Sequence, residues 1–395
     1  MKLHMLPIVG GLTLGLAAAC APQHSQADPP AVRQIQGDGY SLEIIDNSET
    51  FSQALAINAS GQMIGMREVA GEQAGIFSQE SFFFDGQQSI KLPQLEGFTN
   101  LEVAALSDTG RAVGYASRPI GHPGGSLTAV LWDSATGQLT RLPPIAGDTA
   151  CQAHDISSDG LRVSGYSNGS NPPRIRPCVW SYNPKSQNWE VEVLSVLDEY
   201  NPYLVASNVL LSPDGQRVAA CITVARYPNG QFDSSLFAWE WSSGQWKRRP
   251  VSDEQLVLRD MNNRGEIAGT YTGRNGRDPC FVDAAGKLVR IGIFAGDVSG
   301  EARGVNAEGT VVGFSDDPGG PEGGPQAFVW SAGKSRAMAL PEETVFSSAF
   351  GINDRGQIAG LLDVTLSPAP PRGEATKPAE ATVKTLAFRW TPAPP

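Results

Sequence analysis

The stretch Ala349–Gly360, AFGINDRGQIAG, decides the fold, because the chain contains seven versions of it. Each version has an aliphatic residue, then Asn or Ser, two variable residues, a glycine and a short apolar run. The glycines are Gly61, Gly110, Gly160, Gly215, Gly265, Gly309 and Gly356. They follow one another at intervals of 44 to 55 residues, which indicates a repeat protein whose units stack into one body.

Each version predicts a β-hairpin. In the first version, apolar residues of the segment Ala54–Ile57 precede the turn, and Met63 and Ile64 follow it. Asn or Ser early in such a turn can bond its own backbone, and glycine at the last position supplies a positive φ. We therefore interpret the seven Asn and Ser residues as turn residues rather than as ligand contacts.

Each repeat continues with a variable loop, an apolar-aromatic segment, a small turn and a further apolar segment. In the sixth repeat the last two segments are Ala327–Gly333 and Ser335–Leu340. Four strands in roughly fifty residues are typical of a propeller blade. The sequence thus predicts an all-β, seven-bladed β-propeller of four-stranded blades, which forms a single domain over residues 40–395. We expect the third-strand aromatic residues to pack between blades, namely Trp132, Trp180, Trp330 and Trp390.

The two ends of the repeat region predict how the ring closes. The seventh repeat ends with LAFRWTPAPP and has no fourth strand, whereas Tyr40–Asp46, YSLEIID, precedes the first hairpin and alternates like a strand. We expect this N-terminal segment to complete the last blade, because that arrangement removes an open sheet edge.

The segments between second and third strands are expected to be long, dissimilar loops that emerge at one end of the ring. They are Arg67–Glu80, Ala116–Leu127, Ser167–Pro177, Thr223–Ser235, Thr270–Pro279, Ser315–Gln326 and Asp363–Thr385. Variable loops on a regular scaffold usually carry binding. The last of them, residues 363–385, is Pro-rich and is predicted to be disordered, either as a tolerated insertion or as a flexible docking segment.

Composition and charge bound the class of protein. Charged residues make up 18% of the chain, and it contains 44 glycines and 29 prolines, which favours an all-β, extracytoplasmic protein. A formal charge of −11 argues against nucleic acid or an anionic membrane surface as partner. Phosphate loops and dinucleotide fingerprints are absent, so no cofactor is expected.

The N-terminus has the features of an export signal over residues 1–20. Its apolar run, Leu6–Leu16, is too short for a permanent membrane span. The following LAAAC resembles the bacterial lipoprotein signal, which implies lipidation of Cys20 and, through Ala21 after it, outer-membrane retention. The alternative is ordinary cleavage after Ala19 or Ala21, which releases a periplasmic or secreted protein. Residues 21–39 are predicted to form a flexible tether.

Four further cysteines are candidates for disulfides. They are Cys151, Cys178, Cys221 and Cys280, and in an oxidising compartment they predict two bridges with three open connectivities. The chain has no CxxC motif and no Cys/His pair at metal spacing, so no metal site is expected.

The repeats resemble the HAF-repeat family of bacterial extracellular proteins. ALAINASGQMIG, ARGVNAEGTVVG with QAFVW, and AFGINDRGQIAG with LAFRW carry the resemblance, which covers about residues 40–390. The histidine of the family's name is replaced by Gln326 and Leu386. The third and fourth repeats are similar to those of TolB-type propellers. The resemblance implies an envelope protein but gives no activity, and its TolB-like part implies protein interaction.

Three functions remain open. The first is a non-enzymatic, cell-envelope scaffold that binds a protein or glycan through the loop-rich face, and the third is a purely structural envelope protein. The alternative is a propeller hydrolase or lyase that acts on polysaccharide with carboxylates at the axis. The four histidines suggest no Ser/His/Asp triad, which favours binding, so no catalytic residue is assigned. Two or more buried carboxylates in an axial pocket would favour the enzyme.

Overall fold

A computed structural model describes twelve segments of the chain. They are residues 33–46, 51–70, 77–118, 127–170, 173–195, 204–226, 231–252, 256–273, 276–316, 324–342, 344–366 and 382–393. Every regular element in these segments is a β-strand. The described residues contain no helix that is long and apolar enough to cross a membrane. The expected signal peptide, with Cys20, lies outside the described residues.

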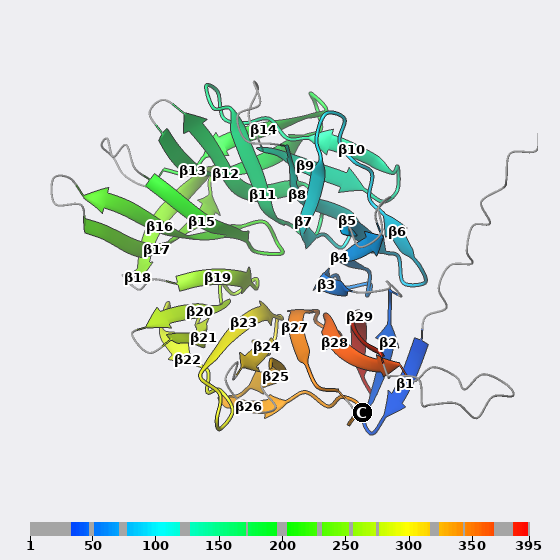
Figure 1. The fold of residues 1–395 in the computed structure, drawn as a ribbon. Coiled ribbons are helices and arrows are strands. Elements are labelled where there is room, and N and C mark those ends of the chain that lie inside the picture. The colour runs from blue at the N-terminus through cyan, green and yellow to red at the C-terminus, as the bar shows by residue number, and fades with distance from the viewer. Residues whose placement is uncertain are drawn as a thin grey trace, which may run out of the picture. The chain divides into compact units, whose positions relative to one another are not determined.

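Six of the seven sheets consist of four antiparallel strands that are consecutive in the sequence (Figure 1). In the first three blades the strands are β3 (Ser52–Ile57), β4 (Met63–Ala70), β5 (Phe77–Phe84), β6 (Ser89–Lys91); β7 (Asn100–Leu106), β8 (Arg111–Ser117), β9 (Leu127–Asp133), β10 (Gln138–Arg141); and β11 (Ala150–Ile156), β12 (Arg162–Ser170), β13 (Pro173–Asn183), β14 (Asn188–Val193).

The next three blades follow the same order. Their strands are β15 (Leu204–Leu211), β16 (Arg217–Arg226), β17 (Gln231–Ser242), β18 (Gln245–Ser252); β19 (Leu256–Met261), β20 (Ile267–Gly273), β21 (Gly276–Val282), β22 (Leu288–Arg290); and β23 (Ser299–Val305), β24 (Val311–Asp316), β25 (Gln326–Ser331), β26 (Lys334–Ala337). The first strand of each blade contacts the first strand of the next, so these strands surround the axis (Figure 1).

The seventh blade closes the ring as predicted. Its strands are β27 (Ser347–Ile352), β28 (Ile358–Leu366), β29 (Thr382–Pro392), and then β2 (Tyr40–Ile44) and β1 (Arg33–Gly37) from the N-terminal part. β2 pairs with β29 so that Leu42 lies opposite Trp390. The strand β1 corrects one expectation, since residues 33–37 of the predicted tether pair with β2 as a fifth strand. Its alternation is carried by a single apolar residue, Ile35, which is why composition alone suggested a tether.

The core is divided among the seven junctions between neighbouring blades. Each junction has its own cluster of buried apolar side chains. Third-strand aromatic residues fill them as predicted: Trp180 is fully buried, Trp132 and Trp330 are buried, and Trp390 is partly buried. Burying one such side chain contributes roughly 1.5–3 kcal/mol, so each blade is stabilised mainly by its neighbours.

Several expected loops are shorter than predicted, because the strands continue into them. Strand pairing covers most of the expected loops Ser167–Pro177, Thr223–Ser235 and Thr270–Pro279. In the fifth blade, for example, β20 and β21 stay paired up to Gly273 and Gly276. Polar and glycine residues on these strands gave no apolar alternation, so the sequence pattern underestimated strand length.

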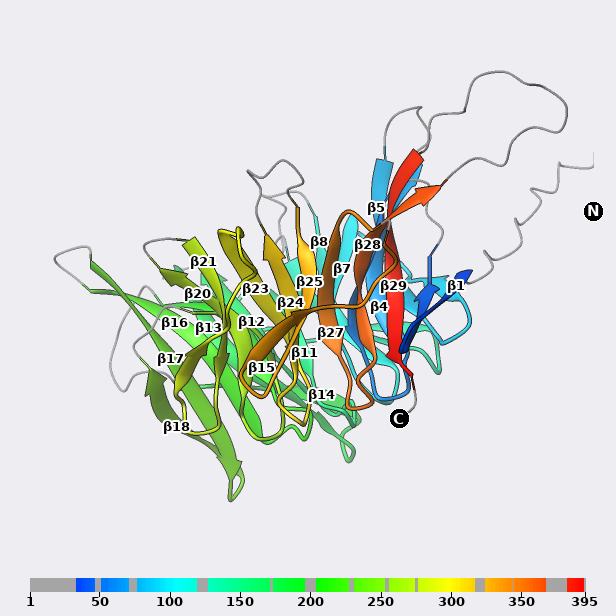
Figure 2. The ribbon, with the colours of Figure 1, turned by 90° about the horizontal axis from the view of Figure 1, so that it is seen from below.

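The Pro-rich segment 363–385 is corrected in the same way. β28 continues to Leu366 and β29 begins at Thr382, with Asp363 opposite Thr385 in the register. The remaining residues 367–381 lie outside the described part of the chain. Seen from the side, β25, β27 and β29 stand close to upright, whereas β16 and β17 run obliquely (Figure 2).

The expected disulfides are absent from the structure. Cys151, Cys178, Cys221 and Cys280 are all buried free thiols. Each lies in an apolar cluster at a blade junction, where it packs as a small apolar side chain. Cys151 and Cys178 share a blade, but β12 separates their strands. The number of cysteines and the expected compartment therefore suggested pairs, whereas the sheet topology decides which cysteines lie on adjacent strands.

Candidate functional site

The seven turns between first and second strands converge around the axis and form what we call the turn layer. It contains the pattern's Asn and Ser residues, namely Asn58, Ser107, Ser157, Ser212, Asn262, Asn306 and Asn353. Each turn ends with its glycine at a φ between 68° and 81°, in the left-handed region.

The Asn side chains confirm the interpretation as turn residues and add a second role. Asn353 Oδ1 accepts hydrogen bonds from the backbone N–H of Arg355 and Gln357, both at 3.0 Å. Its Nδ2 donates to the backbone carbonyl of Asn58 in the first blade at 2.8 Å. The same amide therefore shapes its own turn and binds the next blade.

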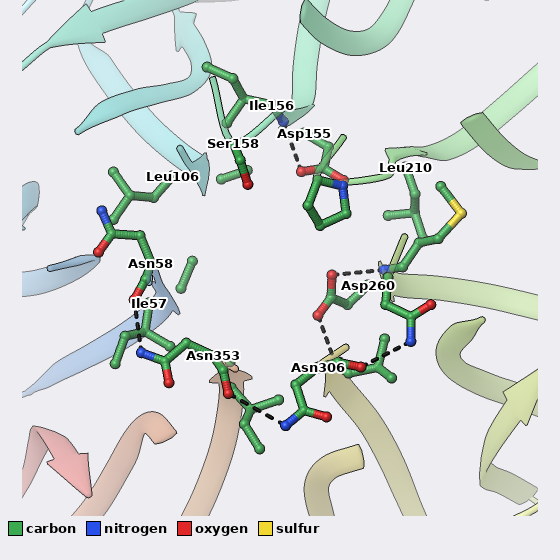
Figure 3. A pocket seen from close by; sticks show the side chains of 18 of the residues that line it. Ile57, Asn58, Leu106, Asp155, Ile156, Ser158, Leu210, Asp260, Asn306 and Asn353 are labelled. Carbon is green, nitrogen blue, oxygen red and sulfur yellow. Dashed lines mark hydrogen bonds between the residues drawn. The ribbon is translucent and has the colours of Figure 1, made fainter. Parts of the chain in front are cut away.

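Such bonds connect every pair of neighbouring blades. Asn58 Nδ2 donates to the Ser107 carbonyl, Asn262 Nδ2 to the Asn306 carbonyl and Asn306 Nδ2 to the Asn353 carbonyl, at 3.0, 2.9 and 3.5 Å. Where Ser replaces Asn, backbone N–H groups bridge the blades: Asp108 donates to Ser158, and Ser158 to Pro213. The turn layer is thus a closed ring of hydrogen bonds. Figure 3 shows the part of this ring that joins Asn58, Asn353 and Asn306.

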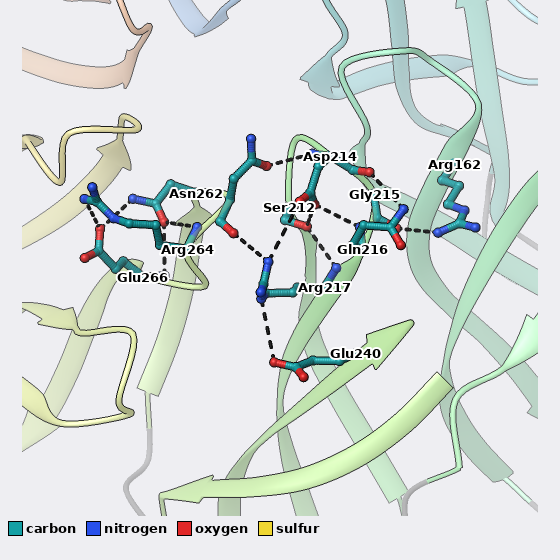
Figure 4. A network of polar contacts seen from close by, with 11 residues as sticks. Arg162, Ser212, Asp214, Gly215, Gln216, Arg217, Glu240, Asn262, Arg264 and Glu266 are labelled. Carbon is teal, nitrogen blue, oxygen red and sulfur yellow. Dashed lines mark hydrogen bonds and ion pairs between the residues drawn. The ribbon is translucent and has the colours of Figure 1, made fainter. Parts of the chain in front are cut away.

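Arginines reinforce the ring at the Ser-containing turns. Arg162 and Arg217 donate through Nη1 to the carbonyls of Gly215 and Asn263 at 2.7 and 2.6 Å (Figure 4). The fourth blade is joined to the fifth by a further bond, from the Asp214 N–H to Asn263 Oδ1 at 2.7 Å. All these groups serve the scaffold.

Every first strand contains a β-bulge a few residues before its turn. The unpaired residues are Leu55, Ala104, His154, Asn208, Arg259, Arg303 and Phe350, which we call the bulge layer. A bulge inserts one extra residue and re-aims a side chain. Unlike the turns, these seven positions have no residue type common to all of them, and the interior of the ring is therefore asymmetric.

A cavity of about 370 Å³ lies on the axis between the two layers (Figure 3). Its lining includes six of the bulge residues, all except Asn208. The volume is within the range of small-ligand sites, roughly 300–1,000 Å³. Leu55, Ala104 and Phe350, from three contiguous blades, form an apolar arc, whereas His154, Arg259 and Arg303 come from the other side of the ring.

Two partly buried carboxyls in the lining bear on the enzyme alternative, for which buried carboxylates in an axial pocket were expected. Asp155 and Asp260 directly follow bulge residues, and part of each faces the cavity (Figure 3). Desolvation by the surrounding protein raises the pKa of Asp155 to about 8 and that of Asp260 to about 6, against the lowering effect of amide hydrogen bonds. The charge of Asp260 raises the pKa of Asp155 further.

Both carboxyls are also engaged in the scaffold. Asp155 accepts the backbone N–H of Ile156 and, across the junction, that of Leu211, both at 2.8 Å. Asp260 accepts those of Met261 and Val305, also at 2.8 Å. Each carboxyl therefore joins two blades, as the turn asparagines do.

His154 is a neutral imidazole in the same lining. Its Nδ1 accepts the backbone N–H of Val209 at 3.0 Å, which assigns the proton to Nε2. Burial lowers the pKa of His154 to about 4. Its Nε2–H has no partner among the described residues, so it is one of the few free donors at the cavity.

Two carboxylates of the turns, Asp108 and Asp354, also line the axial cavity. The turn carboxylates Asp108 and Asp354 accept backbone N–H groups of neighbouring blades. Within the described segments, no group of three or more His, Cys, Asp or Glu side chains is placed to hold a metal ion. His122 and the tips of several second-to-third-strand loops lie outside the described residues.

Comparison with known proteins supports the fold but identifies neither a family nor a function. No protein-family model matches the chain, and no curated protein matches it by sequence. The propeller domain of the Trilobed protease from Pyrococcus furiosus has 9% identity and a TM-score of 0.51, with 86% of this chain and 94% of that chain covered. That domain has an open velcro topology, whereas here β2 pairs with β29.

A second solved structure is the oligogalacturonate lyase from Vibrio parahaemolyticus, with 9% identity, a TM-score of 0.52 and coverage of 92% and 98%. TolB from Acinetobacter baumannii has 15% identity and covers 84% and 81%, but its TM-score of 0.40 is too low to support an argument. The chain is thus a seven-bladed β-propeller, and its resemblance to the HAF-repeat family stays a prediction.

Proposed function

We propose that this chain is an exported cell-envelope β-propeller that binds a protein or glycan and does not catalyse a reaction. The observation that carries the proposal is the state of the polar groups around the axial cavity. The turn amides and both aspartates are engaged with backbone groups of neighbouring blades. Few side chains are left to perform chemistry, whereas a shaped, asymmetric cavity remains for recognition.

Export rests on the N-terminal sequence and on the resemblance to extracellular repeat proteins. Anchoring through a lipidated Cys20 would hold the propeller at the outer membrane, while simple cleavage would release it. The second strands end and the third strands begin at the end of the ring opposite the turns, and we propose this end as a second surface for partners.

A crosslinking pull-down from cell envelopes tests the binding function. We would compare the wild-type chain with Arg303→Gln at the cavity and with a variant that lacks residues 119–125 between β8 and β9. Loss of a specific partner in either variant supports binding and identifies the surface. If both variants recover the same partners as the wild-type chain, in the same amounts, neither surface has a role in binding.

The polysaccharide enzyme remains the second candidate, because Asp155 and Asp260 share one axial cavity. A lyase with the same fold, the oligogalacturonate enzyme, shows that propellers can house such chemistry. The test is incubation with polygalacturonate and with neutral glycans, followed by measurement of new chain ends. Cleavage that disappears in Asp155→Asn and in Asp260→Asn would replace the binding proposal.

A further inference from the structure

Three arginines surround one buried carboxylate beside the axial cavity. Glu301, with a side chain only 6% exposed, lies 3.1 Å from Arg259, 2.9 Å from Arg277 and 2.7 Å from Arg303. Within this cluster three positive charges face a single negative charge. Burial, and next the charge of Arg259, lower the pKa of Arg303 to about 10, which reflects the cost of crowding these cations.

The two bulge arginines keep unused donors. Arg259 and Arg303 both contact Glu301 through Nη2, and no described residue accepts a hydrogen bond from their Nη1 atoms. Their Nε atoms are buried without a partner. The side chains are 27% and 26% exposed, and both line the cavity.

Aromatic packing holds one of these guanidinium groups in place. The Arg303 guanidinium carbon lies 5.3 Å from the ring centre of Phe350 and 5.6 Å from that of Phe314. A guanidinium fixed between rings is preorganised for a planar carboxylate. Phe350 also belongs to the apolar arc of the cavity, so cationic and apolar surfaces adjoin there.

The lining favours an amphipathic acid over a sugar. A sugar ring needs many free polar groups around it, but the turn amides, Asp155 and Asp260 are engaged with backbone atoms. Arg259 and Arg303, from neighbouring blades, offer free donors that suit one oxyanion, and the arc of Leu55, Ala104 and Phe350 suits an adjoining apolar group.

We propose that the axial cavity binds a carboxylate attached to a small apolar group, with Arg259 and Arg303 as the carboxylate-binding residues. This inference rests on the proposed binding function and names the ligand chemistry of its site. Two sources supply such a group: the free C-terminal residue of a polypeptide, or a small organic acid.

Isothermal titration of the full chain with matched probes tests the inference. Acetyl-Gly-Gly-Leu with a free carboxylate is compared with its C-terminal amide, and N-acetylleucine with N-acetylleucinamide. We expect each acid that binds to bind at least about tenfold more tightly than its amide, because only the acid makes charge-assisted hydrogen bonds. Binding of the peptide alone indicates a chain terminus, and binding of N-acetylleucine alone indicates a small acid.

Variants assign the contact. Arg303→Gln and Arg259→Gln should each weaken acid binding by roughly tenfold or more, with Arg303→Lys between wild type and glutamine. The matched control is Arg277→Gln, since Arg277 also pairs with Glu301 but is 61% exposed and does not line the cavity. It should leave affinity within about twofold.

Equal binding of acid and amide, or no loss in both glutamine variants, overturns the inference. So does the absence of binding by every probe. In that case a partner recovered in the envelope pull-down would leave the proposed function standing, so the two failures are distinguishable.

Discussion

The turn layer and the bulge layer lie only a few residues apart on the same strands, yet they differ in almost every respect. The turns repeat Asn or Ser at one position seven times, and either the Asn side chain or backbone N–H groups of the turn bind the next blade. The bulges repeat only a backbone irregularity, and their side chains range from Ala104 to Arg303. The repeated layer closes the ring, and under the proposed function the varied layer is the one that recognises a ligand.

Between these layers, neighbouring inner strands are held together either by close backbone approach at glycines or by hydrogen bonds from aspartate side chains. A Cβ on Gly304 would come within 3.1 Å of Gly351 Cα, and one on Gly351 within 3.3 Å of Ala56 Cα. Inner strands therefore approach closely in this part of the ring. Elsewhere Asp155 and Asp260 reach across to the next strand through their carboxyls.

We expect the largest loss of stability when the strands that close the seventh blade are removed. This deletion tests whether the hydrogen bonds of the turn layer alone can hold the ring together. Deletion of residues 33–44 removes β1 and β2, including the buried Tyr40, Leu42 and Ile44. At about 1.5–3 kcal/mol for each buried side chain, the loss approaches the total stability of a typical domain. Thermal unfolding should shift down for the whole protein, not only for one end.

The matched deletion of residues 33–37 alone should have a much smaller effect, because β1 is an outer fifth strand. An unchanged melting temperature after deletion of both strands would show that hydrogen bonds of the turn layer suffice.

Within the turn layer, Asn353→Ala should cost about 2–3 kcal/mol in the free energy of unfolding. The amide makes three hydrogen bonds in its own turn, with the N–H groups of Arg355 and Gln357 and with Gln357 Oε1, and a fourth to the Asn58 carbonyl, which its removal leaves buried and unpaired. The control is Asn188→Ala, whose single bond to Ser186 is exposed. Urea unfolding should show a larger loss in the free energy of unfolding for Asn353→Ala than for Asn188→Ala. Equal losses would contradict a stabilising role for the hydrogen bonds of the turn layer.

The pH dependence of stability should identify the carboxyls that join the layers. The pKa of Asp155 is raised from 3.8 to about 8, so this group favours the folded state fully below pH 3.8 and loses that contribution as pH rises to about 8. The stability of Asp155→Asn relative to wild type should therefore increase from pH 4 to pH 8. Parallel profiles in urea unfolding would contradict the raised pKa.

Asp260→Asn provides the matched comparison for this series. Its pKa is raised less, to about 6, so the relative gain of this variant should stop near pH 6.

The smallest stability effect is expected in the bulge layer. Arg303→Gln should change the free energy of unfolding by less than about 1 kcal/mol, because Arg259 and Arg277 still pair with Glu301. Thermal unfolding measures this directly. A loss as large as that of Asn353→Ala would show that the bulge layer also holds the ring.

The sequence predicted the repeats, the hairpin turns and the closing strand, because each has a local pattern of apolar, Asn or Ser, and glycine residues. It did not predict the bulge layer, although a signal was present. In the last repeat Ala349 and Ile352 are both buried, but their odd spacing cannot lie on one face of a regular strand. The extra residue between them, Phe350, is the bulge.

No local sequence pattern could predict which side chains from different blades meet at the axis. Arg259, Glu301 and Arg303 come from two blades, and their meeting depends on ring geometry and on bulge orientation. The free thiols were missed for the same reason, since the topology, not the spacing, decides which cysteines can meet. The strand β1 was missed because its exposed, polar residues resemble a linker.

The most direct test of the separation between the two layers is the affinity of acetyl-Gly-Gly-Leu for two variants, measured by titration at a temperature where both are folded. We predict that Asn353→Ala keeps the wild-type affinity within about twofold, whereas Arg303→Gln loses roughly tenfold or more. Equal losses in the two variants, or a loss confined to Asn353→Ala, would contradict the assignment of ring closure to the turn layer and recognition to the bulge layer.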